Sequence, residues 1–537
     1  MVIKENSYYN YKYIYNNKKQ TKYIIMSDNN KKGIWKVISA SSMGTMIEWY
    51  DFYIFGSLAV VLSTKFFPSD NPTAAFLSTL ATFAAGFVVR PFGALFFGRL
   101  GDLIGRKYTF MVTLLLMGGA TFVIGCVPSY ETIGYAAPVL VLVLRLLQGL
   151  ALGGEYGGAA TYVAEHAPKG EKGYWTAWIQ TTATVGLFVS LLVILATKSL
   201  LSKEQFDDWG WRVPFWVSIL MVFVSVQIRK NMHESPEFAK AKAEGKTATN
   251  PLKESFGNKY NLKFVLLALF GATMGQGVVW YTGQFYAMNF LKTVQMVDAS
   301  QVETLLGIAL VLGTPFFIVF GWLSDKIGRK NIMMVGMLVA ILLYRPIYKM
   351  MYKTTDVTLK TEIVEKTKMV PSMKEIDATK IDSIYTTNKE YSDGTLLEEV
   401  KTVHLENGKV ILDEKGKEKI ETKITKKINS SDMALLIFLV FVQVIFVTMV
   451  YGPIAAFLVE MFPVKIRYTS MSLPYHVGNG IFGGLLPAIS TYFVTTAKDA
   501  GDPEFYLEGL WYPIIIAGIS FIIGMIYIDR KINTLHE

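Results

Sequence analysis

Long apolar runs, each about the length of a membrane-spanning helix, are the feature of this chain that most limits its fold. A bilayer core about 30 Å thick is crossed by roughly 20 apolar residues in an α-helix. About twelve such runs follow one another, and most connections between them are short. They are residues 34–63, 73–97, 108–127, 136–164, 174–197, 211–229, 262–291, 302–322, 331–351, 433–459, 470–495 and 510–529. The sequence therefore predicts an all-α membrane protein with twelve transmembrane helices.

Composition supports a membrane protein and argues against other classes. Hydrophobic residues make up 52% of the chain and charged residues 18%, against about a quarter charged in soluble proteins. The net charge of +10 lies in clusters between apolar runs, which favours a lipid surface over nucleic acid as partner. The single cysteine, Cys126, rules out an intrachain disulfide. Motifs of hydrolases, zinc proteases and phosphate-binding loops are absent from the sequence, so we expect no enzymatic activity, cofactor or metal.

The N-terminal segment lacks the features of a signal peptide. Residues 1–33 are predicted to be a disordered cytoplasmic segment, and the ordinary leader that opens at Met26 suggests that translation starts there. A basic arm that begins at Met1 is the alternative. Lysines and arginines are concentrated in alternate loops, which predicts cytoplasmic N- and C-termini.

One polar cassette occurs twice, as GRLGDLIGRK at 98–107 and as GWLSDKIGRK at 321–330. A second pair, EHAPKGEK at 165–172 and EMFPVKIR at 460–467, follows the fourth and tenth runs. The first pair is 223 residues apart and the second 295, so about 72 extra residues enter the second half. The chain therefore reads as two parallel, pseudo-symmetric halves of six helices each.

The predicted units follow from this repeat. They are the N-terminal half 34–229, a cytoplasmic linker 230–261, the C-terminal half 262–351 and 433–531, and an insert 353–431 between helices 9 and 10. The insert alternates polar and apolar residues, and ENGK at 406–409 predicts a hairpin turn. We expect a small, β-rich, extracytoplasmic domain, whose role as ligand trap, docking site or decoration stays open.

The motifs resemble those of the major facilitator superfamily. The paired cassettes are similar to its signature loop, and RLLQGLALGGE at 145–155 to its fourth-helix motif. Four segments resemble the metabolite:proton symporters. This family includes permeases for 2-oxoglutarate, shikimate, citrate and proline or betaine. The four segments are GTMIEWYDFYIFG at 44–56, VVRPFGALFFGRLGD at 88–102, GLALGGEYGG at 149–158 and FPVKIRYTSMSL at 462–473. The resemblance implies secondary active transport by alternating access.

The chemistry of the cassette suggests a gate. Its glycines allow a tight turn and close helix packing, while Asp102 is suited to face a helix N-terminus. We expect Arg106 and Lys107 to anchor lipid headgroups. The resemblance implies a latch that breaks between transport states; a simple basic turn would not explain Asp102 and Asp325 at matching positions. The predicted gate residues are Gly98, Asp102, Gly105, Arg106, Gly321, Asp325, Gly328, Arg329, Glu165, Glu460 and Arg467.

Five ionisable residues lie within the apolar runs of the first half, where they are costly and usually functional. They are Glu48, Asp51, Arg90, Arg145 and Glu155. Glu48 and Asp51 are three residues apart on one helix face, so we expect one of them to carry the proton, with Glu155 assisting proton release. Arg90 and Arg145 suit a carboxylate substrate, and Arg145 also suits gating. The alternative is that the five residues only neutralise one another.

The second half offers fewer polar candidates. Span seven carries a stripe of Gln276, Trp280 and Tyr281, and span eleven carries His476 and Asn479. We expect proton-coupled symport of a small organic anion, with substrate and protons as partners. The alternative is a zwitterion such as proline or betaine, held by an aromatic cage. That cage would consist of Trp49, Tyr53, Trp280 and Tyr281. A third hypothesis is a receptor that acts through the insert.

Overall fold

The computed structural model describes residues 33–68, 72–230, 232–375, 380–406, 409–411, 418 and 420–528. The predicted disordered leader, apart from Gly33, and the start at Met26 lie outside the described residues, as do residues 529–537.

The N-terminal helices begin with Gly33–Ser57, the first helix. They continue as α2 Ala59–Phe66, α3 Pro72–Val88, α4 Arg90–Leu103, α5 Arg106–Ile124, α6 Tyr130–Ile133, α7 Ala136–His166, α8 Lys172–Gln180, α9 Thr182–Leu200, α10 Lys203–Asp208 and α11 Val213–Lys230. A short helix, α12 Pro236–Ala243, lies in the predicted linker.

The C-terminal helices include several π-helical segments. They are α13 Lys259–Ala268, η3 Leu269–Thr273, α14 Met274–Tyr281, η4 Thr282–Tyr286, α15 Ala287–Asn289, η5 Phe290–Val294, α16 Ala299–Ile327, α17 Arg329–Thr355, α18 Ser430–Tyr451, α19 Ile454–Met461, α20 Arg467–Val477, η9 Gly478–Gly483, α21 Leu486–Asp499, α22 Phe505–Glu508 and α23 Trp511–Tyr527.

Within the described residues, ten helices are long and apolar enough to cross a membrane, or eleven if the first helix and α2 form one bent span. That pair bends by 69°. The predicted second span, residues 73–97, is divided into α3 and α4 at Val89. Pro91 explains the division, because a proline in a helix interior clashes with the preceding turn but is tolerated at a helix start. The count of twelve spans remains a prediction.

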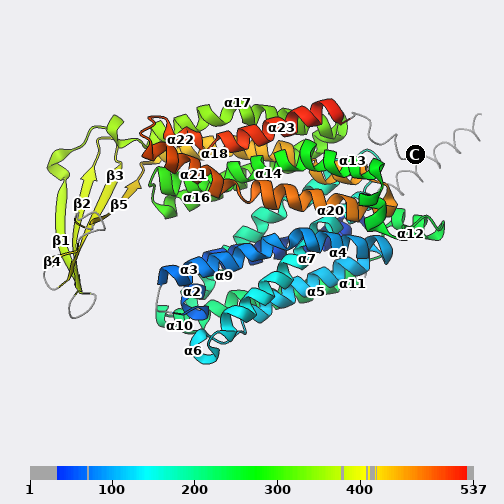
Figure 1. The fold of residues 1–537 in the computed structure, drawn as a ribbon, viewed down its shortest axis with the longest axis horizontal. Helices are drawn as coiled ribbons and strands as arrows, with labels where there is room; N and C mark the ends of the chain where they lie inside the picture. The colour runs from blue at the N-terminus through cyan, green and yellow to red at the C-terminus, as the bar shows by residue number, and fades with distance from the viewer. Residues whose placement is uncertain are drawn as a thin grey trace, which may run out of the picture.

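The helices form two groups that lie side by side (Figure 1). Helices up to α11, coloured blue to teal, make the N-terminal half, and α13 to α23, green to red, make the C-terminal half. The halves meet where α4 lies beside α20; we name this the cassette end, because both cassettes lie there. The opposite end, where the sheet projects from the C-terminal half, is the sheet end.

A five-stranded antiparallel sheet lies between α17 and α18, within the predicted insert. Its strands are β1 Lys368–Glu375, β2 Lys380–Glu390, β3 Leu396–Glu406, β4 Lys409–Val410 and β5 Ile420–Lys427. β3 and β4 pair with Glu406 opposite Lys409, although residues 407–408 of the predicted turn lie outside the described residues.

The sheet is attached to the C-terminal half at its base. The backbone of Lys426 exchanges hydrogen bonds of 2.7 and 2.8 Å with Met296 and Asp298, just before α16. Lys360 donates to Asp393 at 2.7 Å and to Asp432, at the start of α18, at 2.5 Å. Burial alone would lower the pKa of Lys360, but these carboxylates outweigh it and raise the pKa. These contacts fix the sheet to the C-terminal half.

Candidate transport site and gate

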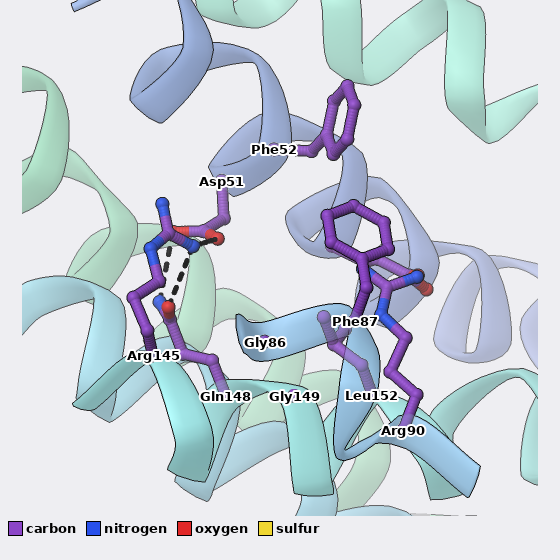
Figure 2. A pocket seen from close by; sticks show the side chains of 10 residues that line it. Asp51, Phe52, Gly86, Phe87, Arg90, Arg145, Gln148, Gly149 and Leu152 are labelled. Atoms are coloured by element: carbon purple, nitrogen blue, oxygen red, sulfur yellow. Dashed lines mark hydrogen bonds and ion pairs between the residues drawn. The ribbon is translucent and has the colours of Figure 1, made fainter. Parts of the chain in front are cut away.

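A small, narrow cavity lies inside the N-terminal half, at the level where the first helix, α3, α4 and α7 meet (Figure 2). It is lined by Glu48, Asp51, Phe52, Gly86, Phe87, Arg90, Arg145, Gln148, Gly149 and Leu152. Figure 2 shows Arg145 and Arg90 on opposite sides of this cavity. Arg90 reaches it because the break before Pro91 places Arg90 at the first position of α4.

Asp51 and Arg145 form a tightly bonded pair on one side of the cavity. Arg145 Nη1 donates to Asp51 Oδ2 at 2.7 Å and to Gln148 Oε1 at 2.8 Å. Gln148, one turn further along α7, donates to Asp51 Oδ1 at 3.0 Å. Both carboxylate oxygens of Asp51 therefore accept hydrogen bonds, as suits an ionised carboxylate with a fixed partner.

Glu48 and Arg90 form a looser pair on the other side. Arg90 Nη1 lies 3.4 Å from Glu48 Oε1, and the two side chains keep 17% and 11% of their surface exposed. Arg90 Nε has no hydrogen-bond partner among the described residues. The guanidinium group lies 4.2 Å above the ring of Phe87. Glu48 and Asp51 thus contact different arginines, and of the two arginines Arg90 has the weaker contact with its carboxylate.

A second small cavity adjoins the first and reaches the C-terminal half. It is lined by Glu48, Trp49, Phe52, Phe87, Arg90, Trp280 and Tyr281. Trp49 and Trp280 face each other across the two halves, with ring centroids 5.3 Å apart. Tyr53 packs against Trp49 at 6.1 Å but does not line either cavity. The charged pair and three of the four predicted cage residues therefore share one space.

Glu155 lies away from both cavities, buried among α5, α7 and α11. It accepts from Arg229 Nη2 at 2.7 Å and from Thr113 at 2.6 Å. Sequence reasoning missed Arg229, because it stands at the very end of an apolar run, next to the basic linker. The excess of three acids over two arginines in the first half was the signal that a third base was needed. A side chain at Gly44 would overlap this pair, since an added Cβ would lie 1.7 Å from Glu155 Oε1.

The polar candidates of the C-terminal half lie outside the lining of the two cavities. Gln276 and Asn479 exchange two hydrogen bonds of 3.1 Å between α14 and η9. His476 is buried, and its Nε2 has no partner among the described residues. The reciprocal amide pair holds two helices together, so a direct substrate contact for these residues remains a prediction.

The first cassette joins the two halves. Asp102 accepts from the backbone N–H groups of Tyr468 at 3.3 Å and Thr469 at 2.8 Å, at the start of α20. A carboxylate is favoured there by the unpaired amides and dipole of the helix. Arg106 lies 3.0 Å from Asp102 and 3.5 Å from Glu165. The turn between Asp102 and Arg106 needs Gly105, whose φ is +129°.

The expected headgroup contact of Arg106 is wrong. Its side chain has no exposed surface, and it donates to the carbonyl oxygens of Gly101 at 2.9 Å and Val464 at 2.7 Å. The guanidinium group is enclosed because residues of the linker and of α20 pack over it. Phe238 of α12 lies against it, with 4.3 Å from Cζ to the ring centroid.

The second cassette repeats this arrangement in the opposite direction. Asp325 accepts from the N–H groups of Gly173 at 2.9 Å and Tyr174 at 2.7 Å, at the start of α8. Arg329 lies 2.7 Å from Asp325 and 2.9 Å from Glu460. Gly328 has a φ of +98°, so it makes the same turn as Gly105. Each half thus places an aspartate at a helix start of the other half.

Close packing accompanies these contacts. A Cβ added to Gly98 would lie 2.9 Å from Thr469 Cα, and one added to Gly321 would lie 2.4 Å from Ala177 Cβ. At both positions the opposite half lies too close to leave room for a side chain. These two glycines therefore bring the halves together at the cassette end.

The linker adds residues that the sequence did not indicate. Arg467 contacts Glu165 at 2.9 Å and Glu237 at 2.5 Å, and Glu237 also contacts Lys172 at 3.1 Å. Burial would raise the pKa of Glu237, but Arg467 and Lys172 outweigh it and lower the pKa. Glu234 accepts from the Arg106 N–H at 3.1 Å and so caps α5.

This chain is similar to transporter families and to several known transporters. The family described as Sugar (and other) transporter matches residues 36–259, and the family MFS/sugar transport protein matches residues 159–364. The alpha-ketoglutarate permease of Escherichia coli K12 is 28% identical over 510 residues, which cover 94% of this chain and 96% of the permease.

Two further relatives differ in the substrate that they are named for. The shikimate transporter of Escherichia coli K12 is 35% identical over 57% of this chain and 70% of its own length. The proline/betaine transporter of Salmonella typhimurium LT2 is 26% identical over 90% of this chain and 83% of its own. The solved structure of the proton:xylose symporter XylE aligns with a TM-score of 0.65 over 95% of this chain and all of that one. The two sequences are only 15% identical, so this alignment shows that the fold is shared and no more.

Proposed function

Because this chain belongs to the metabolite transporters of the major facilitator superfamily, we propose that it couples the uptake of a small organic anion to protons. It is a multi-pass membrane protein and a transporter, not an enzyme. The observation that carries the proposal is the loose Glu48–Arg90 pair at the junction of the two cavities.

Exchange of partners at Arg90 links the anion to the proton. Among the described residues Arg90 Nε has no hydrogen-bond partner, and its contact with Glu48 is long, so a substrate carboxylate can take the place of Glu48. Glu48 is then left without a counter-charge in a largely buried site, where an unpaired carboxylate is costly and takes up a proton. One anion and one proton enter the site together with no net change in its charge. Asp51 stays bonded to Arg145 and Gln148 in this scheme and positions α7.

The two cassettes serve as the gate in this proposal. We place the cassette end and both chain termini in the cytoplasm, in the inner membrane of a bacterium. With both aspartates bonded across the halves, the structure corresponds to a state closed toward the cytoplasm. Release of substrate requires these contacts to break, which is the alternating-access cycle.

A zwitterionic substrate is the second candidate. Trp49, Trp280 and Tyr281 line the second cavity together with Glu48. Aromatic faces hold quaternary or secondary ammonium groups by cation–π contact, while Arg90 would bind the carboxylate. The receptor hypothesis has no observation of its own in the structure.

Uptake by proteoliposomes under an imposed inward proton gradient tests both candidates. The labelled substrates are 2-oxoglutarate, shikimate, citrate, proline and betaine, and the variants are Arg90→Gln and Trp280→Leu. We expect accumulation of a carboxylate that Arg90→Gln abolishes and that Arg345→Gln, at the sheet end beside Glu508, leaves intact. Accumulation of betaine or proline alone, lost with Trp280→Leu, would select the zwitterion.

A further inference from the structure

Two buried tyrosines stack face to face across the two halves, between the cavities and the cassettes. Tyr156 belongs to α7 and Tyr475 to α20. Their ring centroids are 3.7 Å apart, and the ring planes differ by 5°. Tyr156 is 4% exposed and Tyr475 7%. The N-terminal and C-terminal halves are therefore in direct ring contact at this level.

Each ring is held by a partner from its own half. Gln180 of α8 donates to the hydroxyl of Tyr156 at 2.8 Å. The hydroxyl of Tyr475 lies 2.6 Å from that of Tyr451, at the end of α18. Separation of the halves would break the ring contact but keep both of these hydrogen bonds. This arrangement suits two leaves of a gate that are each fixed to their own side.

The position of the stack along the helices gives it a function. On α7, Tyr156 is eight residues from Gln148 of the cavity and nine from Glu165 of the gate. At 1.5 Å per residue the stack lies about 12–14 Å from each. On α20, Tyr475 lies eight residues beyond Arg467. The pair thus lies between the substrate site and the cassettes, beside the Tyr468 hydroxyl, which also crosses the halves to donate to the carbonyl oxygen of Gly154.

The stack also adjoins the substrate cavity through a chain of rings. Trp280, which lines the second cavity, lies 6.4 Å from the ring of Tyr451. Tyr451 in turn lies 6.4 Å from Tyr156, with ring planes 15° apart. Displacement of Trp280 by a bound substrate would therefore be transmitted to the stacked pair by direct ring contacts.

We propose that Tyr156 and Tyr475 form an inner gate that closes the substrate cavity toward the cassette end, independently of the cassettes. The proposal rests on the proposed transport function and on the placement of the cassette end in the cytoplasm. A single aromatic stack is weak enough to open in every cycle, whereas the charged contacts at the cassettes hold the closed state.

Thiol labelling tests the inner gate without any substrate. The parent carries Cys126→Ser and the reporter Leu152→Cys, which lines the first cavity one turn from Tyr156. A membrane-impermeant maleimide is added to inverted vesicles, in which the cytoplasmic side faces the bath. A second reporter, Lys326→Cys, exposed at the cassette end, establishes which side that end faces. The Lys326→Cys reporter tests the proposed orientation, and uptake by proteoliposomes tests the proposed transport function. Either of these proposals can therefore be wrong without deciding whether the inner gate exists.

In Tyr475→Ala we expect the labelling rate of the Leu152→Cys reporter to rise about three- to tenfold, the shift that loss of one aromatic pair permits. Tyr475→Phe keeps the stack and loses only the contact with Tyr451, so its rise should be smaller.

Tyr352→Ala is the matched control, because Tyr352 and Tyr506 stack at 3.8 Å and 12° within the C-terminal half. It should label like the parent. Unchanged labelling in Tyr475→Ala, with the Lys326→Cys reporter accessible, would overturn the proposal. An equal rise in Tyr352→Ala would also overturn it, since it would indicate general loosening of the fold. Each variant is first checked for an unchanged thermal midpoint and monodisperse elution, and Tyr156→Ala, which also removes the stack, replaces Tyr475→Ala if that variant fails.

Discussion

Both cassettes place an aspartate at the start of a helix from the opposite half, but the linker covers only the first. Asp102 and Arg106 have no exposed side-chain surface, whereas Arg329 of the second cassette remains 12% exposed. Glu234 caps the turn of the first cassette, and Glu237 joins Arg467 to Lys172 beside it.

The difference shows which properties a repeated motif carries with it. The turn and the aspartate at a helix start recur, because they depend on glycine and carboxylate positions within the cassette itself. Complete enclosure does not recur, because it depends on a linker that exists once; Arg329 and Asp325 keep 12% and 3% of their side-chain surface exposed. We therefore expect the first cassette to be the stronger of two latches, and three experiments test this difference.

The largest effect is expected from removal of the cassette carboxylates. Asp102→Asn leaves Arg106 buried with a reduced counter-charge, which should cost about 3 kcal/mol of closed-state stability, the lower end for breaking a buried pair. Asp325→Asn should cost less, because the Arg329 side chain keeps 12% of its surface exposed and Asp325 3%. Thermal midpoints of the purified variants measure both. Equal losses would show that the linker does not distinguish the cassettes.

A smaller effect is expected at the start of α12. Ser235 accepts from the Phe238 N–H at 3.2 Å and donates to Glu165. Ser235→Ala removes a helix cap worth about 1 kcal/mol and also a contact of the first latch. Ser202→Ala is the control, because Ser202 caps α10 at the sheet end and touches no gate residue.

Two measurements, the thermal midpoint and the initial uptake rate, distinguish the role of Ser235 from that of Ser202. Both variants should lose some stability, but only Ser235→Ala should alter uptake. A change in uptake with Ser202→Ala would mean that cap loss alone explains the result.

The smallest effect is expected from pH at Glu237. Its pKa is lowered in the closed gate, so the contact stabilises closure above the ordinary carboxyl pKa of about 4.3 and is lost as pH falls through the lowered value. Hydrogen exchange of residues 234–243, corrected for intrinsic rates, should show less protection at pH 4 than at pH 7. Glu237→Gln should remove this difference, and Glu244→Gln, whose partner Lys246 lies in the same exposed turn, should keep it. Retention of the difference in Glu237→Gln would assign it to another group.

The sequence predicted the part of the candidate site that depends on residue type. Charged groups within apolar runs identified Glu48, Asp51, Arg90 and Arg145, and the structure brings all four to one cavity. The same reasoning failed to find the partner of Glu155, because Arg229 comes from a helix 74 positions away in the chain. Nor did it indicate which carboxylate is loosely held, since that depends on distances of 2.7 and 3.4 Å.

The fold was predicted in the same way and with the same limits. The apolar runs indicated where helices lie, but several of them are divided, among them the first at Ser57–Leu58 and the second at Val89, where glycine or proline stands nearby. The alternation in residues 353–431 indicated strands, and the pairing order β1-β2-β3-β4, with β5 on β3, came from the structure. Strand order is set by contacts between segments, which local alternation does not encode.

The sequence alone indicated the apolar helices, the repeated cassettes with their turns and the set of ionisable residues within the apolar runs. These follow from hydropathy, glycine positions and the cost of an ion in lipid, all of which are local properties. Only the tertiary structure decided which charges pair, that the linker encloses the first cassette, and that Tyr156 meets Tyr475. Those contacts join residues up to several hundred positions apart, and the packing of whole helices, rather than any short segment, brings them together.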